Sequence, residues 1–337
     1  MTKVVSRPTL RDVAHHAGVS VISASRVMRD APNISDGLRA RVRAAANALG
    51  YTPNRIAGSL RGQASDLVAV IVPSMSNSVF ADILDGIDEG FKGTPLRTVL
   101  GLSRYDMDEE EAILRELLSW NPAGVIISGL EHSAAATAIL QRLECPVIEV
   151  MDSDGDPIDT SVGFSMVKAG QVMADHFLAQ GYRRIGYVGA WGELPVRSRK
   201  RRLAFEARLA ENGVELVDRQ IEEDQSSFAA GAAGLQALLA RSPEIEAVFF
   251  ANDDLALGAL FHCLSVGIAV PERLALAGFN GLDMRDGITP RLTTIRSPRN
   301  EIGARAGRIM LDRVRGRPSA ERGRIDLSVS LLQGATT

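Results

Sequence analysis

Three residues near the N-terminus have side chains that could contact the edges of DNA bases. The Arg26 guanidinium can donate two parallel hydrogen bonds to guanine O6 and N7, whereas Val21 and Ile22 offer only apolar contact, Ile22 to a thymine methyl group. These residues lie in a basic segment, because residues 1–62 hold ten Lys and Arg against three Asp and Glu. The rest of the chain holds 28 against 38. This distribution favours contact with a polyanion, although charge alone is equally compatible with a solvated basic surface.

Residues 9–50 are predicted to form three short helices that position these side chains. The second helix runs from Val21 to Met28 and follows a turn that contains glycine. Capping and helix-breaking residues mark the boundaries of the three helices: Thr9 with Asp12, Gly18, Ser20, Ser35 and Gly50. A helix, a tight turn and a second helix over about 20 residues form a helix-turn-helix, whose second helix enters the major groove. A three-helix bundle without a role in DNA binding is the alternative.

A short segment beginning at Pro53 follows these helices. Proline suits the first position of a helix, and Gly62 ends the segment. A helix of this length is too short to be stable alone in water. The segment is therefore expected to fold only on binding a partner.

The remainder of the chain alternates short apolar runs with stretches of helical length. The apolar runs are rich in β-branched residues and are mostly bounded by Gly, Pro or Asn, which predicts buried parallel strands. The predicted strands are Leu67–Val72, Arg97–Leu102, Gly124–Ser128, Val147–Met151, Ile185–Val188, Ala247–Phe250 and Leu274–Ala277, with helices such as Val79–Phe91, Glu109–Trp120 and Leu255–Ser265 between them. Seven or more pairs of a strand and a helix are too many for one sheet, so two α/β lobes are predicted. A ligand is expected to bind beyond the carboxyl ends of the strands.

Hydroxyl, amide, carboxylate and aromatic side chains follow these predicted strands. Such groups suit a polyhydroxylated ligand, because every buried hydroxyl needs a hydrogen-bond partner. Asn77, Asp152, Asn252 and Asn280 are the favoured contacts, although helix capping explains each of them nearly as well. Five of the six residues 197–202 are cationic, which indicates either a solvated face or a site that attracts carboxylate or phosphate.

The N-terminal segment resembles the DNA-binding head and hinge of the LacI/GalR family of repressors. The resemblance rests on TLRDVAHHAGVSVISASRVM, followed by YTPNRIAGSLRG. It implies a hinge helix that forms only in the dimer on DNA, with Leu60 wedged into the minor groove. The DNA contacts predicted from the motif and the resemblance are Thr9, Leu10, Ser20, Val21, Ile22, Ser25, Arg26, Asn33, Asn54, Arg55, Ala57 and Leu60.

The larger part of the chain also resembles this family, whose ligand domain has the fold of periplasmic sugar-binding proteins. The phrases PSMSNSVFADIL, LLSWNPAGVII and NDDLALGA are most similar to the gluconate-operon repressors of the family. This resemblance implies a sugar acid such as gluconate or a derivative, and a ligand-clamping arginine at Arg201 or, second, Arg199. A neutral sugar or a corepressor is the alternative effector. The predicted effector contacts are Ser74, Asn77, Phe80, Ser103, Asp152, Trp191, Arg199, Arg201, Asn252, Phe279 and Asn280.

These features predict a fold with an all-α helix-turn-helix head and a two-lobed α/β ligand domain. The expected organisation is a head over 1–50, a hinge over 51–62 and an effector domain over 63–337. Lobe 1 is expected to span about 63–161 and 292–323, and lobe 2 about 162–291 and 324–337. The expected partners are pseudo-palindromic operator DNA, a small effector and a second copy of the chain. A dimer is expected rather than a tetramer, because the sequence has no C-terminal leucine heptad repeat.

Other classes of protein receive little support from the sequence. We find none of the motifs GxGxxG, GxxxxGK[ST], GxSxG or HExxH, so neither an enzyme nor a cofactor is expected. Residues 152–156 start like a calcium loop, but its sixth and twelfth positions do not fit, and no metal is expected. The N-terminus does not resemble a secretory signal, no apolar stretch reaches 18 residues, and the two cysteines are far apart. A cytoplasmic protein without membrane contact is therefore expected, rather than an exported sugar receptor.

Overall fold

The computed structural model describes residues 8–28, 31–52, 65–192, 196–317 and 321–337. The chain forms two compact units, Met1–Ser65 and Asp66–Thr337. The boundary expected after residue 62 is close to this division. The hinge helix expected after Pro53 lies outside the described residues.

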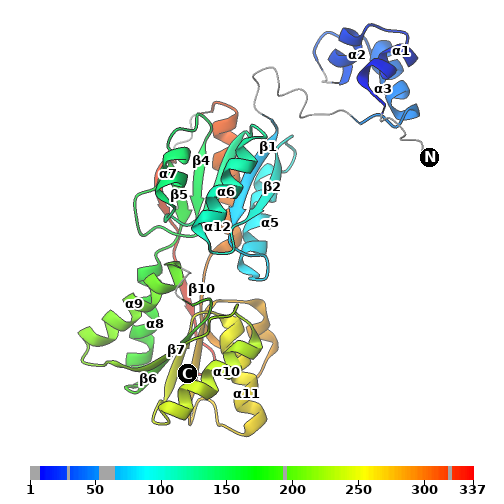
Figure 1. Cartoon of the computed structure of the whole chain (residues 1–337). Helices are drawn as coiled ribbons and strands as arrows, with labels where there is room; N and C mark the ends of the chain where they lie inside the picture. Colours follow the sequence, from blue (N-terminus) through cyan, green and yellow to red (C-terminus); the bar gives the residue numbers. More distant parts are fainter. Residues whose placement is uncertain (1–7, 29–30, 53–64, 193–195, 318–320) are drawn as a thin grey trace, which may run out of the picture. The chain divides into compact units, whose positions relative to one another are not determined.

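Three helices make up the described core of the smaller unit: α1 (Leu10–His16), α2 (Val21–Met28) and α3 (Asp36–Ala48) (Figure 1). Thr9 and Asp12 form the expected capping box at the start of α1. The Ser20 hydroxyl caps α2 by accepting a hydrogen bond of 3.0 Å from the Ser23 amide. Ser35 occupies the N-cap of α3, as expected, but its side chain makes no capping hydrogen bond. Small apolar residues fill the space between the helices: Val13, Ala14, Ala17, Ala24, Val27, Val42, Ala45 and Ala46.

The larger unit consists of two lobes, each built on a six-stranded sheet (Figure 1). Lobe 1 contains β1 (Leu67–Val72), α5 (Val79–Phe91), β2 (Arg97–Leu102), α6 (Met107–Leu118), β3 (Gly124–Ser128), α7 (Ala134–Leu140), β4 (Val147–Val150), β5 (Thr160–Gly163), α12 (Arg299–Val314) and β11 (Gly323–Asp326). Lobe 2 contains α8 (Met166–Ala179), β6 (Ile185–Gly189), α9 (Val196–Glu211), β7 (Leu216–Ile221), α10 (Phe228–Arg241), β8 (Ala247–Phe250), α11 (Asp253–Val266), β9 (Ala275–Asn280), η1 (Asp283–Gly287), β10 (Thr293–Arg296) and β12 (Ser330–Leu332). The predicted alternation of strands and helices in two lobes is confirmed.

The order of the strands determines where each sheet can bind a ligand. The sheet of lobe 1 has the order β11-β5-β4-β3-β1-β2 and is entirely parallel. In lobe 2 the order is β12-β10-β9-β8-β6-β7, and only β12 runs antiparallel to its neighbour. The chain reverses its direction of winding at β1 in lobe 1 and at β6 in lobe 2. Open α/β sheets bind ligands beyond the carboxyl ends of strands at such points.

The chain passes between the lobes after β5, after β10 and after β11. The first of these crossings agrees with the boundary expected near 161. The other two boundaries, at 292 and 324, were placed too early, because β10 pairs with β9 in lobe 2 and β11 pairs with β5 in lobe 1. Both strands are short and were not recognised as strands from the sequence.

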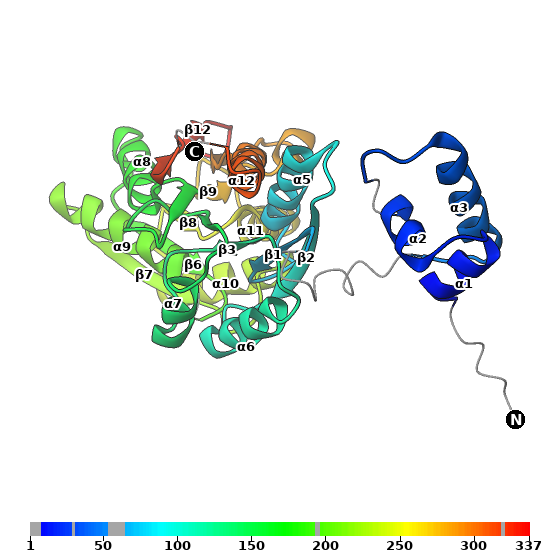
Figure 2. The ribbon, with the colours of Figure 1, turned by 90° about the horizontal axis from the view of Figure 1, so that it is seen from above.

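Helices α5 and α12 of lobe 1 pack side by side through glycines (Figure 2). A Cβ atom on Gly303 would lie 2.1 Å from the Ile83 carbonyl oxygen, and one on Gly86 would lie 2.3 Å from the Asn300 carbonyl oxygen. Real side chains cannot occupy that space, so the glycines allow the two backbones to approach closely. The contact anchors α12, which begins where the chain has just returned from lobe 2.

Candidate functional site

Two apolar side chains at the start of α2 are exposed in the smaller unit. Val21 and Ile22 retain 44% and 75% of their accessible surface, whereas Ala24 and Val27 on the other side of the helix are buried. Burying Val21 and Ile22 therefore requires a partner. The methyl groups of thymine in the major groove are one such surface.

The other predicted DNA contacts are placed unequally by the fold. Arg26 is exposed on α2, and its guanidinium donates a long hydrogen bond of 3.4 Å to the Pro32 carbonyl. Thr9, Ser20 and Asn33 are exposed, Ser25 is half-buried, and Leu10 packs against the core of the unit. The side chain of Leu10 is thus used by the fold itself. Asn54, Arg55, Ala57 and Leu60 lie outside the described residues.

A cavity of about 560 Å³ lies between the two lobes of the larger unit. Its walls come from residues that follow the carboxyl ends of strands in both lobes and from the first turns of α5 and α9. The lining residues are Asn77, Val79, Phe80, Tyr105, Met151, Met166, Ala190, Trp191, Arg197, Ser198, Arg201, Ala251, Asn252, Phe279 and Asn280. The cavity therefore occupies the position expected for a ligand in this type of fold.

Arg201 is a buried cation on the wall of this cavity. One of its terminal amino groups donates a 2.6 Å hydrogen bond to the Ala251 carbonyl, and its guanidinium carbon lies 3.7 Å from the centre of the Phe279 ring. Its Nε has no hydrogen-bond partner, and no ion pair joins it to a carboxylate among the described residues. Burial lowers the pKa of Arg201 to about 10, so the group remains charged near neutral pH. A buried cation without a carboxylate is a site for an anionic ligand.

Arg197 lies one helical turn before Arg201 and lines the same cavity. Its guanidinium donates a 2.5 Å hydrogen bond to the Ser128 hydroxyl of lobe 1 and lies 5.8 Å from the centre of the Phe80 ring. None of the described residues that line the cavity is Asp or Glu. Two arginines and no carboxylate make the cavity strongly positive.

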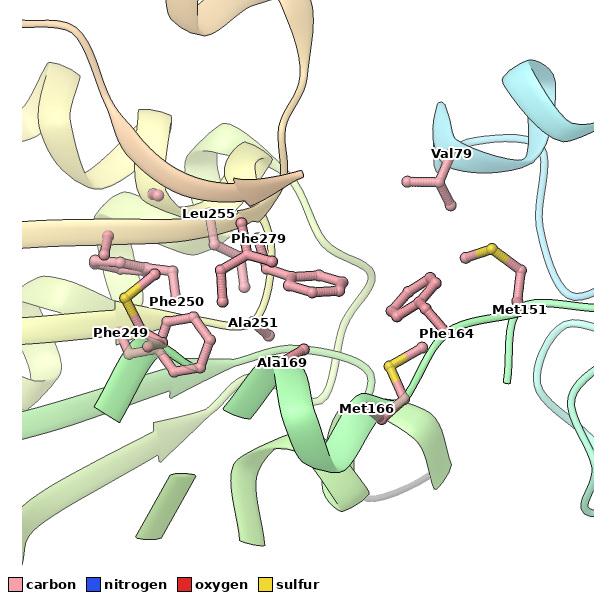
Figure 3. Packing of buried hydrophobic residues seen from close by; sticks show 14 of the residues in the cluster. Val79, Met151, Phe164, Met166, Ala169, Phe249, Phe250, Ala251, Leu255 and Phe279 are labelled. Carbon is pink, nitrogen blue, oxygen red and sulfur yellow. The ribbon is translucent and has the colours of Figure 1, made fainter. Parts of the chain in front are cut away.

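Aromatic rings from both lobes enclose the cavity. The rings of Tyr105 and Trp191 lie 5.0 Å apart, one from each lobe. Figure 3 shows Phe164 between Phe279 on one side and Met151 with Val79 on the other, and the rings of Phe164 and Phe279 lie 6.0 Å apart. Tyr105, Trp191 and Phe279 line the cavity and provide apolar walls for the carbon skeleton of a ligand, whereas Phe164 belongs to the core that supports Phe279.

Three asparagines bring amide groups to the cavity. Asn252 caps α11, accepting a 3.1 Å hydrogen bond from the Leu255 amide, and Asn77 accepts one of 3.3 Å from the Val79 amide. At both positions, a local hydrogen bond from a backbone amide coexists with lining of the cavity. Asn280 differs, because it is 4% exposed and ends β9 instead of preceding a helix. Its side-chain amide lines the cavity and can donate to or accept from a ligand hydroxyl.

Strained backbone gathers at this cavity. Tyr105, Met151, Trp191 and Asn280 have positive φ angles of 64°, 76°, 68° and 116°. All four residues line the cavity. Such conformations cost roughly 1–3 kcal/mol each and tend to occur where function requires a particular side-chain position.

Four predicted effector contacts do not lie on this cavity. Asp152 is fully buried and bound by Lys200, whose Nζ is 2.9 Å from its Oδ2, and the Ser74 hydroxyl bonds to Ser76 at 2.7 Å. Arg199 is exposed and points elsewhere, because residues two apart on a helix lie on opposite sides. Ser103 lines a neighbouring cavity instead.

Some residues on the cavity were not predicted from the sequence: Tyr105, Met151, Met166, Arg197 and Ser198. Helical spacing could have identified Arg197, because it lies four residues before Arg201 and shares its side of the helix. Tyr105 follows the predicted strand that ends at Leu102 and could have been included for that reason. The two methionines carried no comparable signal.

The described residues were also compared with the requirements of a metal site and of a membrane-spanning helix. No three His, Cys, Asp or Glu side chains are grouped there as they would be around a metal ion. Within the same residues, no helix combines the length and the apolar character needed to cross a membrane.

Comparison with known proteins finds a family match in each of the two units. Residues 9–54 match the bacterial regulatory proteins of the lacI family, and residues 174–337 match a periplasmic binding protein-like domain. The chain is 38% identical to the HTH-type transcriptional regulator GntR of Pseudomonas aeruginosa, over 94% of this chain and 92% of that one.

Solved structures agree with these matches. A LacI family transcriptional regulator from Silicibacter pomeroyi is 45% identical, with a TM-score of 0.93, over 98% of this chain and 99% of that one. The Lac repressor dimer bound to operator and the anti-inducer ONPF is 26% identical, with a TM-score of 0.82, over 98% of this chain and 99% of that one.

Proposed function

Because the chain belongs to the LacI family of bacterial transcriptional regulators, we propose that it represses a carbohydrate-utilisation operon and that a sugar acid releases it from its operator. Regulators of this family are not enzymes. The observation that carries the proposal is the cavity with Arg197 and Arg201 on its wall and no carboxylate among its described lining residues. Buried cations select an anion, and the amides and aromatic rings suit a polyhydroxylated chain.

The proposed mechanism couples the cavity to the DNA-binding head. A ligand that bridges both lobes favours one arrangement of them over another, and this difference in affinity is what can alter operator binding. We propose a homodimer in which two hinge segments fold together on a pseudo-palindromic operator, with Val21, Ile22 and Arg26 in the major groove and Leu60 in the minor groove. The hinge part of this proposal rests on the sequence resemblance.

The test is a calorimetric titration of the full-length protein with gluconate, 6-phosphogluconate and glucose, the last of which is the neutral control. We expect a sugar acid to bind and glucose to bind at least about tenfold more weakly, because one charge-assisted contact contributes about 1.5–3 kcal/mol. The same acid should release an operator fragment in a gel-shift assay. Binding of glucose alone would refute the sugar-acid proposal, and tighter operator binding in the presence of the acid would make it a corepressor.

A further inference from the structure

A second cavity of about 480 Å³ lies beside the first in the larger unit. Tyr105 and Arg197 line both cavities, so the two cavities adjoin at these side chains. The other lining residues are Pro73, Ser103, Asp106, Met107, Glu110, Ser128, Gly129, Glu131 and Val196. These residues are more polar than the walls of the first cavity.

Ser103 is a buried polar residue that lines this second cavity. The residue is 4% exposed and lines the cavity, and its hydroxyl is not among the fully buried polar atoms that lack a hydrogen-bond partner. A buried hydroxyl that both donates and accepts is normally satisfied, by the protein or by a bound molecule. Ser103 therefore offers a hydroxyl that can hydrogen-bond a ligand in the second cavity.

The second cavity, unlike the first, has carboxylates among its lining residues. Glu110 accepts a 2.7 Å hydrogen bond from His132, and Glu131 pairs with Lys200, so both carboxylates already have cations. Asp106 is exposed and uses one carboxylate oxygen to cap α6, accepting from the amides of residues 108 and 109 at 2.8 and 2.9 Å. Its other oxygen has no partner among the described residues. Carboxylate oxygens accept hydrogen bonds from hydroxyl groups and repel anions.

We infer that the second cavity is the subsite for an uncharged, hydroxyl-bearing end of the effector, whose carboxylate is held by Arg197 and Arg201 in the first cavity. The inference rests on the proposed function and specifies its ligand class. The effector is a linear polyhydroxy acid with a single anionic end. A second carboxylate or a phosphate at the far end of the effector would lie near the Asp106 carboxylate, and the repulsion between the two anions disfavours its binding.

Matched acids test this charge selection. Gluconate, glucarate and 6-phosphogluconate share a six-carbon chain and differ in the group at the far end, so each is titrated calorimetrically into the full-length protein at low salt. We expect gluconate to bind about threefold to tenfold more tightly than the two dianions, because Asp106 is exposed and partly screened. Equal or tighter binding of either dianion would overturn the inference while leaving the sugar-acid function intact. No binding by any of the acids would overturn the proposed function itself, and the inference with it.

Two variants locate the effect in the second cavity. Ser103→Ala should weaken the binding of gluconate about three- to tenfold, which is the effect of one lost hydrogen bond. The affinity for the three-carbon acid glycerate should stay unchanged. Asp106→Asn retains a good capping residue and should reduce the preference for gluconate over glucarate. Asp108→Asn, in the exposed first turn of α6 and outside the cavity lining, is the matched control. An equal loss for glycerate and gluconate in Ser103→Ala, or an equal effect of the two Asp variants, would contradict the subsite.

Discussion

Arg201 combines two opposing demands in one side chain. Its charge is buried without a carboxylate, which costs free energy in the unliganded protein, yet the same charge attracts an anionic ligand. The charge of Arg201 therefore favours ligand binding but lowers the stability of the unliganded protein. The hydrogen bond to the Ala251 carbonyl and the ring of Phe279 only partly compensate the charge.

We predict that Arg201→Met weakens the binding of gluconate about 10- to 100-fold, because a charge-assisted contact is lost. The melting temperature of the unliganded protein should stay the same or rise by a few degrees, since a buried charge is replaced by an apolar side chain. Calorimetry and thermal unfolding measure the two effects. Arg208→Met, a change of a partly exposed residue outside the cavity lining on the same helix α9, is the control for affinity. Unchanged gluconate affinity in Arg201→Met would refute the role of Arg201.

His132 forms a second buried ionic group, away from the predicted contacts. Its Nδ1 lies 2.7 Å from Glu110 Oε1, and its Nε2 lies 3.5 Å from Glu149 Oε1. Burial alone would lower the pKa of His132, but the two carboxylates outweigh burial and raise this pKa to about 9. The folded protein therefore holds this proton more tightly than the unfolded chain does.

The stabilising contribution of His132 is complete below its unfolded pKa of about 6.5 and is lost as the pH rises through about 9. We predict that the melting temperature falls by several degrees between pH 6.5 and pH 9.5. Thermal unfolding across this range measures the change. His132→Gln should show a smaller fall, and an identical fall in both proteins would assign the pH dependence to other groups.

Local capping distinguishes the helices of the smaller unit. Ser20 caps α2 with its side chain, whereas Ser35 occupies the same position of α3 without a capping hydrogen bond. Ser20→Ala should therefore destabilise α2 by about 1 kcal/mol and accelerate hydrogen exchange of its amides. Ser35→Ala, the matched control, should have a much smaller effect on α3. Equal effects of the two substitutions would show that the Ser20 hydroxyl does not stabilise α2.

The packing of α5 against α12 gives a second prediction about helices. Gly303→Ala places a Cβ 2.1 Å from the Ile83 carbonyl oxygen, so the helices must separate, at a cost of about 1–3 kcal/mol. Gly37→Ala in α3 has no atom within 4 Å of its new Cβ and should be neutral or stabilising by up to about 1 kcal/mol. Urea unfolding measures both variants. Equal stabilities would show that the contact between the helices adapts without cost.

In the larger unit, Lys200 joins the two lobes. It lies on α9 of lobe 2, and its ammonium group binds Glu131 and the fully buried Asp152 of lobe 1. A 3.3 Å hydrogen bond to the Asp154 carbonyl adds to these contacts. Without this cation, Asp152 would be a buried carboxylate with no counter-charge among its described partners. Lys200 therefore stabilises the arrangement in which both lobes line the cavity.

We predict that Lys200→Met weakens gluconate binding about threefold to tenfold, although Lys200 does not line the cavity. The ligand must then supply more of the free energy that holds the lobes together. Calorimetry measures the affinity, and small-angle scattering of the unliganded protein should show a larger radius of gyration. Arg199→Met, an adjacent exposed change, should alter neither quantity. If both variants bind gluconate like the wild type, the lobes do not depend on Lys200.

The sequence by itself determined those elements whose signals are local. The capping box of Thr9 and the limits of α2 depend on neighbouring residues. Strands β1, β2, β3 and β8 were predicted with their observed limits because each is built around a run of apolar or β-branched residues. The edge strand β7 was missed because none of its residues is buried and its polar residues obscure the pattern. The family was equally evident from sequence, since its head motif is contiguous.

Only the tertiary structure decided which polar side chains face the ligand cavity. Arg199 and Arg201 differ little in the sequence, but the orientation of α9 buries one and exposes the other. Asp152 follows a strand as a ligand contact would, yet Lys200, 48 residues later, binds it. Ser103 was predicted beside the other contacts but lines the adjacent cavity. Each outcome depends on the packing of distant segments, which sequence spacing does not contain.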